Sequence, residues 1–250
     1  MKANTIDEVI SFLDTIIETC KQHQSRIGYF ASLYKAMTIG VKVGIEQGAF
    51  ENGPRMERLD VAFANRYLDA YTKFSGGQIA THAWMHAFKA AEQTNLSIVQ
   101  HLLLGINAHI NLDLGIAAAA ISTADDIESL HHDFDLINVV IANVYLSLQE
   151  ELKKISWPVI FLKDIDPTVS DDIVNFSIQK ARDQAWSNAL ILAKSTEIQD
   201  EDIIKSTDII VSEVATCIEN PGGLTNFLIK CILLFESNNV SKNIGILNGG

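Results

Sequence analysis

The clearest chemical potential in this sequence lies in one apolar segment, residues 97–122. His109 and Asp113 stand four positions apart in that segment, so on a helix their side chains share one face and lie one turn apart. A histidine and a carboxylate at this spacing are a common half-site for zinc or iron. The same pair could instead be an imidazole that a carboxylate orients for proton transfer. We therefore predict that His109 and Asp113 form the centre of a buried catalytic site.

A second pair of histidines could complete a metal site. His82 and His86 are also four positions apart, in the segment THAWMHAF upstream of the apolar segment. If the two helices pack together, this pair would join the first one around a divalent transition metal, zinc or iron. Such a metal would activate water or polarise a substrate oxygen, most simply for hydrolysis. In the alternative, His82 and His86 lie on the solvent side of their helix.

The apolar segment carries a second set of polar side chains. Gln100, Asn107 and Asn111 lie roughly opposite the His109–Asp113 pair on a helical projection. A surface helix has one polar face, so two polar stripes predict a central helix that sends polar groups in both directions. We assign Asn107 and Asn111 to the catalytic site, where they would hold the substrate or the metal ligands. The alternative is an internal polar network without chemistry.

Arginines on two predicted helices are candidates for ion pairs or for anion binding. Arg182 and Trp186 share one face in KARDQAWSNAL. An inward arginine needs an acidic partner, for which Asp113 and Asp133 are candidates. We assign Arg182 to substrate binding, as a site for an anion or a carboxylate, and the alternative is a structural ion pair. Arg66, in RLDVAFANRYLDAY, presents the same two alternatives.

His132 and Asp133 form the sequence pair found in helical metal-dependent phosphohydrolases. Those proteins usually place the pair after an apolar helix, whereas here it lies in an acidic stretch, DDIESLHHDFD. We therefore favour an acidic loop in which Asp133 or Asp135 caps the following helix. The chain also lacks a phosphate-binding glycine loop, a GxSxG elbow, paired CxxC motifs and HExxH, so no nucleotide cofactor is expected.

The composition argues against several classes of partner. The net charge of −12 and the pI of about 4.9 indicate an acidic surface, which repels nucleic acid and anionic lipid. The charge-free run 93–112 is long enough to cross a membrane, but its histidines and amides indicate a core helix. Cys20, Cys217 and Cys231 are odd in number and lack paired spacing, and the N-terminus has acids where a signal peptide needs an apolar run. We therefore expect a cytoplasmic protein that acts on a small molecule.

Helical periodicity dominates the chain, which shows no strand alternation. A chain of 250 residues, 48% of them hydrophobic, suits one domain with a sizeable core. We predict an all-α single domain, residues 1–237, of eight or nine helices around a central helix at about 96–121, and a flexible C-terminal tail, 238–250. The other helices are expected from Thr5, at about 25–47, 55–74, 78–93 and 133–154, from Ser170, and at about 200–219 and 222–236, with an irregular connection at 157–169.

The sequence also resembles a known family. The string HLLLGINAHINLDLGIA, with RYLDAY and W-x-x-AF upstream and ARDQAW downstream, is similar to an uncharacterised family of bacterial all-helical proteins. That family carries a domain of unknown function and a signature close to N-A-H-I-N-x-D-L, and the similarity covers roughly 56–190. The resemblance implies no activity, but it points to Trp84 and Trp186, which we assign to substrate binding. Its matched positions are Asn107, His109, Asn111, Asp113, Trp84, Asp133, Asn138, Arg182 and Trp186.

These patterns leave three functions open. The first is a metal-assisted enzyme, most simply a hydrolase, with ligands from the two histidine-containing pairs. The second is a metal-free isomerase or cyclase in which His109, oriented by Asp113, is the acid or base. The third is a binding or scaffold protein with a structural polar network. Bound metal separates the first function from the others, and a pocket that reaches His109 separates the second from the third.

Overall fold

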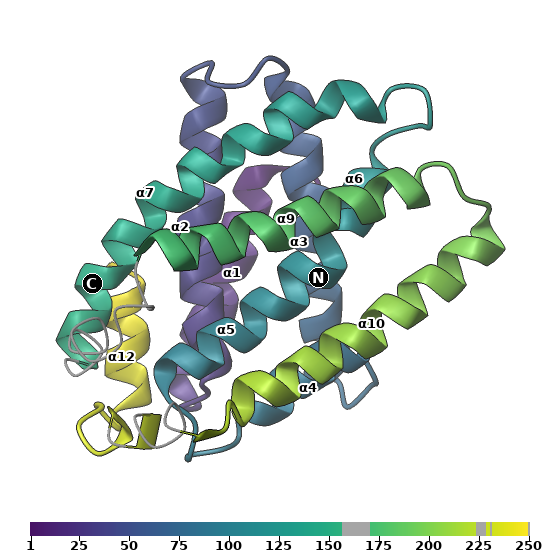
Figure 1. Cartoon of the computed structure of the whole chain (residues 1–250). Helices are drawn as coiled ribbons and strands as arrows, with labels where there is room; N and C mark the ends of the chain where they lie inside the picture. Colours follow the sequence, from purple (N-terminus) through teal and green to yellow (C-terminus); the bar gives the residue numbers. More distant parts are fainter. Residues whose placement is uncertain (157–170, 224–228, 231, 250) are drawn as a thin grey trace.

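The chain folds into one all-α domain around a long central helix, as predicted (Figure 1). The computed structural model describes residues 1–156, 171–223, 229–230 and 232–249, without the side chains of 145, 147 and 171–177. Every element within these ranges is helical. In chain order the elements are α1 (Ile6–Gln22), α2 (Ile27–Glu46), α3 (Gly53–Ser75), α4 (His82–Ala90), α5 (Ile98–Ala108), η1 (His109–Leu114), α6 (Gly115–Ala120), η2 (Ile127–Leu130), α7 (His131–Ile155), α9 (Asp171–Leu192), α10 (Glu197–Glu219) and α12 (Val240–Leu247).

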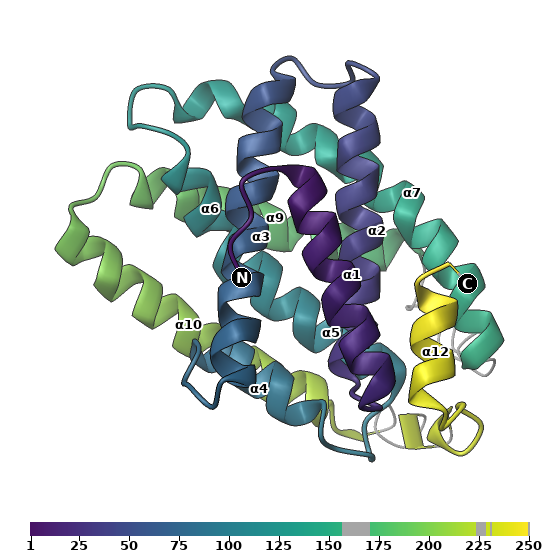
Figure 2. The same ribbon diagram turned by 180° about the vertical axis from the view of Figure 1, so that it is seen from behind.

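Three of these elements, α5, η1 and α6, run without a break from Ile98 to Ala120 and form the predicted central helix. The helix begins with a capping box, in which Ser97 and Gln100 each accept a hydrogen bond from the backbone N–H of the other. α5 contacts α2, α4 and α10, while η1 and α6 contact α3 and α9. Figures 1 and 2 show the central helix between α1, α2 and α3 on one side and α9 and α10 on the other. Polar side chains on both of its faces are therefore buried.

The central helix is also long and apolar enough to cross a membrane, judged by length and composition alone. Of the helices in the described ranges, it alone meets this criterion, and 67% of its most apolar 18-residue window is buried inside the protein. A helix that other helices cover on opposite sides is expected to be apolar on both faces. Its hydropathy therefore agrees with its position in the core.

The middle of the central helix, η1, is π-helical, which the sequence analysis did not predict. A π-helical turn has i→i+5 hydrogen bonds and frequently occurs at functional sites. Here the turn contains both His109 and Asp113, which are buried. Asp113 forms hydrogen bonds to side chains of α3 and α4, and these contacts favour a backbone geometry for which the local sequence HINLDL gives no signal.

Local sequence determines where some of the helices begin, and contacts with distant residues determine where others begin. Thr5 and Asn52 cap α1 and α3 with their side-chain oxygens, as their residue types favour. α4 begins only at His82, not at residue 78, because the Asp208 carboxylate on α10 accepts from the first backbone N–H groups of α4. A side chain distant in sequence thus determines the start of this helix.

The C-terminal residues form a helix where we predicted a flexible tail over 238–250. Val240, Ile244 and Leu247 of α12 are buried, and the helix contacts α1, α2 and α7. Their helical spacing gives α12 one apolar face, which offsets the entropy lost by ordering the end of the chain. The predictions that fall wholly or mostly outside the described residues are the connection at 157–169, the Ser170 cap and the helix at 222–236.

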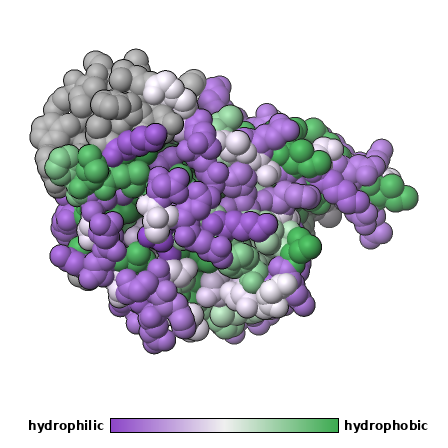
Figure 3. Space-filling model, turned by 90° about the horizontal axis from the view of Figure 1, so that it is seen from below, coloured by the Kyte–Doolittle hydropathy of each residue, from purple (hydrophilic) through white to green (hydrophobic). Residues whose placement is uncertain are grey.

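The face of the molecule seen in Figure 3 is mostly hydrophilic, and its apolar residues form separate groups. The most exposed large apolar side chains lie in different segments: Ile79 before α4 is 84% exposed, Ile198 on α10 is 79% exposed, and Leu234 is 79% exposed. Single exposed apolar residues are common on folded proteins. The strongest candidate for a functional site is in the interior.

Close packing of the central helix on α9 depends on Gly115. A Cβ at this position would lie 2.7 Å from the carbonyl oxygen of Ala185, a backbone atom that cannot turn aside. We expect Gly115→Ala to lower the free energy of unfolding, measured by urea denaturation, by roughly 1–3 kcal/mol. Gly245→Ala is the control, because nothing lies within 4 Å of its added Cβ and alanine favours a helix. Equal destabilisation by both substitutions would contradict this account of the packing.

Candidate active site

The centre of the candidate site is the carboxylate of Asp113, which is 1% exposed. Its Oδ1 accepts a hydrogen bond from Arg66 Nε at 3.0 Å, and its Oδ2 accepts one from Trp84 Nε1 at 2.7 Å. The same Oδ2 lies 3.3 Å from His109 Nδ1. A buried carboxylate needs such donors to offset its lost hydration. They come from α3, α4 and η1, so this one charge ties three elements together.

The Asp113 carboxylate orients the ring of His109. An ionised carboxylate only accepts hydrogen bonds, so Nδ1 carries the ring proton and Nε2 is left as an acceptor. Phe63 stacks on the ring with centroids 3.5 Å apart and planes at 7°, and Tyr34 meets the ring edge-on at 4.4 Å. Nε2 is buried and has no hydrogen-bond partner in the described protein. The imidazole is thus held firmly with its basic nitrogen unpaired.

Burial also determines the charge of His109. Loss of solvent lowers the pKa of His109 below its usual 6.5, because a buried imidazolium is poorly hydrated. The hydrogen bond and charge of Asp113 oppose this shift, and the charge of Arg66 adds to it. The imidazole is therefore neutral at pH 7, and Nε2 is free to accept a proton.

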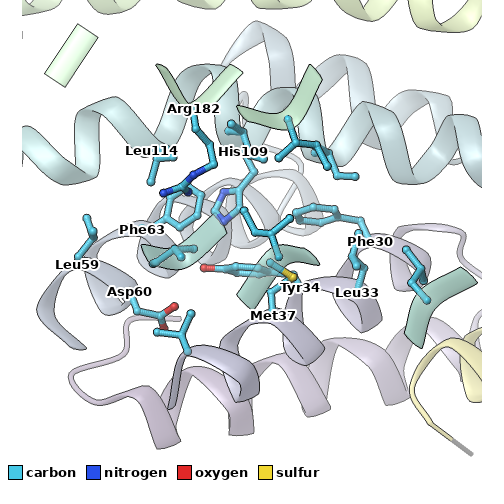
Figure 4. Close-up of a pocket in the computed structure, with 17 residues that line it drawn as sticks. Phe30, Leu33, Tyr34, Met37, Leu59, Asp60, Phe63, His109, Leu114 and Arg182 are labelled. Atoms are coloured by element: carbon cyan, nitrogen blue, oxygen red, sulfur yellow. The ribbon is translucent and has the colours of Figure 1, made fainter. Parts of the chain in front are cut away.

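His109 lines a largely apolar cavity of about 120 Å³, into which its ring points (Figure 4). The walls come from α2, α3, α5, η1, α7 and α9, and they include Phe30, Leu33, Leu59 and Ile141. An engineered apolar cavity of about 150 Å³ binds benzene. The cavity therefore has room for a molecule of about that size, next to the free nitrogen of His109.

Three other polar side chains line the cavity: Tyr34, Asp60 and Arg182. Among the described residues, Asp60 Oδ2 and Arg182 Nε are buried without a hydrogen-bond partner. Figure 4 shows His109 and Arg182 entering from one side and Tyr34 and Asp60 from the other. Buried polar atoms in native proteins nearly always have partners. With His109 Nε2, three residues that line this cavity therefore have a buried polar atom available to a ligand.

Burial gives these groups complementary charges. Burial, and then the charge of Glu57, raises the pKa of Asp60 from 3.8 to about 7, so this acid is partly protonated near neutral pH. Burial lowers the pKa of Arg182 from 12.5 to about 10, which leaves it a cation. Burial also raises the pKa of Tyr34 well above 10, so its hydroxyl keeps the proton. With His109, the cavity contains a base, an acid, a cation and a hydroxyl.

The second predicted histidine pair does not join this site. His82 Nδ1 lies 3.0 Å from Asp208 Oδ2 and its side chain is 76% exposed, while His86 Nε2 lies 3.2 Å from Glu219 Oε1. Both histidines thus turn toward α10, whereas Trp84, two residues from each of them, donates to Asp113 of the central helix. Within the described ranges, no three His, Cys, Asp or Glu side chains converge as metal ligands. The predicted four-ligand set is not assembled, and metal binding itself stays a prediction.

The amides assigned to catalysis lie on the other face of the central helix. Asn107 Nδ2 donates to the Val211 carbonyl of α10 at 2.8 Å, and Asn111 Nδ2 donates to Asn107 Oδ1 at 2.8 Å. Gln100 Nε2 donates to the Ile218 carbonyl at 2.9 Å. The cavity that contains His109 has neither asparagine in its walls. These amides form the structural network of our alternative interpretation, which binds the central helix to α10.

The two predicted substrate-binding tryptophans also lie outside the cavity walls. Trp84 is the donor to Asp113 described above, so it supports the site from behind. Trp186 stacks on His131, with ring centroids 4.5 Å apart, and packs against Phe134. Arg182, by contrast, does line the cavity, as its predicted role requires.

Asp133 is structural, and it does not pair with Arg182. Its carboxylate is fully buried, accepts from the backbone N–H groups of Glu51 and Asn52, and lies 3.7 Å from Arg55. It therefore secures the turn before α3. We predicted Asp133 or Asp135 as the cap of the following helix, and Asp133 does not have this role. His132 is 62% exposed and 3.9 Å from Glu51. The phosphohydrolase-like pair thus forms no common site.

The sequence analysis missed two groups of the cavity, Asp60 and Tyr34. Asp60 follows Met56 and Leu59 on the buried face of α3, and an acid within an apolar helical stripe is a signal that could have identified it. Tyr34 belongs to the apolar stripe of α2 and cannot be distinguished from a core aromatic by spacing. Arg66 was a candidate for an ion pair, but its partner was not identified.

The fold and the site define an all-α protein whose central helix presents a carboxylate-oriented histidine to an apolar cavity. The chain belongs to a family of unknown function, DUF5995, whose model matches residues 6–221. Membership in a family of unknown function agrees with the resemblance found in the sequence. No curated protein and no solved structure matches the chain.

Asp113→Asn tests whether the buried carboxylate holds the site together. An amide nitrogen cannot accept a hydrogen bond, so at least one of the three donors loses its partner. We expect the free energy of unfolding, measured by urea denaturation, to fall by roughly 2–5 kcal/mol. The control Asp69→Asn removes an exposed ion pair with Lys73 and should change it by less than about 1 kcal/mol. Wild-type stability of Asp113→Asn would overturn this role.

Proposed function

We propose that the protein is an acid–base enzyme of the isomerase or cyclase type, in which His109 itself accepts a proton from a small, mainly apolar substrate. One observation carries the proposal: His109 Nε2 is buried and unpaired, and the His109 side chain is part of an apolar cavity wall. The Asp113 oxygens, which a metal site would need, accept instead from Arg66 and Trp84. This arrangement favours proton transfer by the imidazole over metal-assisted hydrolysis.

In the proposed reaction, Nε2 of His109 removes a proton from a carbon of the substrate. Asp113 then stabilises the resulting imidazolium through Nδ1. Asp60, which enters the cavity from the opposite side (Figure 4), returns a proton to another atom of the substrate. His109 then loses its added proton to solvent and Asp60 takes one from solvent, which restores both groups for the next turnover. An isomerisation needs such a base and acid whose environments move their pKa values in opposite directions, and burial has this effect on His109 and Asp60.

A scaffold protein is the main competing interpretation. The two faces of the central helix bear on it, because they differ in how completely their buried polar atoms are hydrogen-bonded. The amides of Asn107, Asn111 and Gln100 all find partners on the α10 side. On the cavity side, polar atoms of His109, Asp60 and Arg182 stay unpaired within the described part of the chain. A purely structural network would leave few such atoms. The contrast supports a ligand on the cavity side.

Ring opening of 1,2-benzisoxazole tests the proposed base without knowledge of the natural substrate. Loss of the carbon-bound proton breaks the N–O bond and yields 2-cyanophenolate. The reaction therefore needs a base, and an acid that donates to the developing phenolate oxygen assists it. The molecule is one six-membered ring with a five-membered ring fused to it, close to the size that the cavity admits. We expect the wild-type protein to accelerate it, and His109→Gln to lose at least about 100-fold of that rate.

The matched control is His101→Gln, a second buried histidine of the central helix whose ring nitrogens are also unpaired but which lies outside the walls of the His109 cavity. It should retain the wild-type rate. Metal analysis of the same samples shows whether a metal contributes. An unchanged rate in His109→Gln, or a rate that follows bound metal, would refute His109 as the base.

The pH profile of this reaction should be bell-shaped. Below the lowered pKa of His109 the imidazolium cannot accept a proton, so the rate rises as pH increases through that value. Above about pH 7 Asp60 loses the proton that it donates, so the rate falls. We expect Asp60→Asn to abolish the alkaline decline and to keep the acid limb. An alkaline decline that persists in Asp60→Asn would assign that limb to another group.

A further inference from the structure

Arg182 is a buried cation that forms no ion pair with the residues that the structure describes. It is 4% exposed, its Nη2 donates to the Phe134 carbonyl, and its guanidinium lies 4.4 Å from the centroid of the Phe134 ring. Its Nε has no hydrogen-bond partner. The ion pairs within the described ranges give Asp113 to Arg66 and Asp133 to Arg55. Both acids that the sequence analysis offered to Arg182 are therefore already used.

A buried guanidinium in this state is costly. Arg182 stays charged at neutral pH, and a charge removed from water normally has a paired ion. One carbonyl and one aromatic face replace only part of its hydration. Because Arg182 lines the same cavity as His109, an anion that enters this cavity would meet the unpaired Nε.

We infer that the substrate carries a carboxylate, which Arg182 binds while the hydrocarbon part fills the cavity beside His109. This inference rests on the proposed function, since it names the substrate class of the same site. Arginine recognises planar carboxylates well. A phosphate has a larger charge that needs more donors, whereas Arg182 and the neutral His109 are the basic residues among the described cavity walls.

The size and walls of the cavity define the rest of the ligand. A volume of about 120 Å³ admits a body of roughly one six-membered ring, by comparison with the benzene-binding cavity of about 150 Å³. The rings of Phe30, Tyr34 and Phe63 surround His109 and favour an aromatic or cyclic hydrocarbon. The substrate class is thus a small aromatic or alicyclic carboxylic acid.

Asp60 is the carboxylic acid among the described cavity walls. Its ionised form would repel such a ligand. Burial raises its pKa to about 7, so near neutral pH much of it is uncharged. The protonated form can also donate a hydrogen bond to an anion. Asp60 therefore opposes the ligand less than an ordinary aspartate would.

Calorimetric titration at pH 6.5 with benzoate and with benzamide tests the inference, because the two molecules share shape and differ in charge. We expect the wild-type protein to bind benzoate at least about tenfold more tightly than benzamide, which corresponds to a difference of about 1.4 kcal/mol in binding free energy. Arg182→Met, which keeps an apolar chain of similar length, should lose this preference and keep its affinity for benzamide. Arg182→Lys keeps the charge and should retain part of the preference. The control Arg58→Met changes an exposed arginine of α3 and should behave as wild type.

Equal affinities of wild-type protein for benzoate and benzamide would overturn the inference, and so would a preference for benzoate that survives in Arg182→Met. His109→Gln separates this result from the proposed function, since it should still bind benzoate while it fails to open 1,2-benzisoxazole. Binding of benzoate without any benzisoxazole opening by wild type would support the carboxylate site and refute the base. Benzisoxazole opening without a preference for benzoate would support the base and refute the carboxylate site.

Discussion

The buried charge of Asp113 is the constraint on which the rest of the site depends. A carboxylate that is 1% exposed must replace its hydration with donors. Arg66 and Trp84 supply them from α3 and α4, so both helices must lie against the middle of the central helix. His109 completes the set from the same helix. The position of His109, the proposed base, is thus a consequence of satisfying one charge.

From this constraint follows the division of the central helix into two faces. On the α10 side, amides such as Asn107 donate hydrogen bonds to backbone carbonyls of α10, which hold the two helices together. On the other side, aromatic rings such as Phe63 hold His109 beside an apolar cavity. Low polarity there keeps the imidazole neutral and Asp60 partly protonated. The same burial therefore stabilises the fold on one face and prepares acid–base groups on the other.

Local signals predicted most of the fold. Helical periodicity, caps such as Thr5 and the apolar central segment gave an all-α domain and its main helices, because these depend on neighbours in the sequence. The His109–Asp113 pair was also predictable, since its spacing fixes its geometry. The prediction of a flexible C-terminal tail was wrong, because the burial of Ile244 in α12 depends on helices near the other end of the chain.

The remaining parts of the site depend on contacts between distant residues. Arg66 reaches Asp113 across 47 positions and Trp84 across 29, and no spacing rule links them. His82 and His86 have the spacing of metal ligands, but the phase of α4 turns them to Asp208 and Glu219 on α10. Spacing within one helix is therefore informative, whereas convergence of two helices requires the tertiary structure.

The most direct test of the account is the protonation state of His109, measured by nitrogen NMR of the protein labelled with 15N-histidine. His109→Gln identifies the signals by their loss. The account predicts a neutral ring at pH 7 with the proton on Nδ1 and an unprotonated Nε2, which persists as the pH falls below 6.5. An imidazolium at pH 7, or a proton on Nε2 in the neutral ring, would contradict the claim that His109 presents a free base to the cavity.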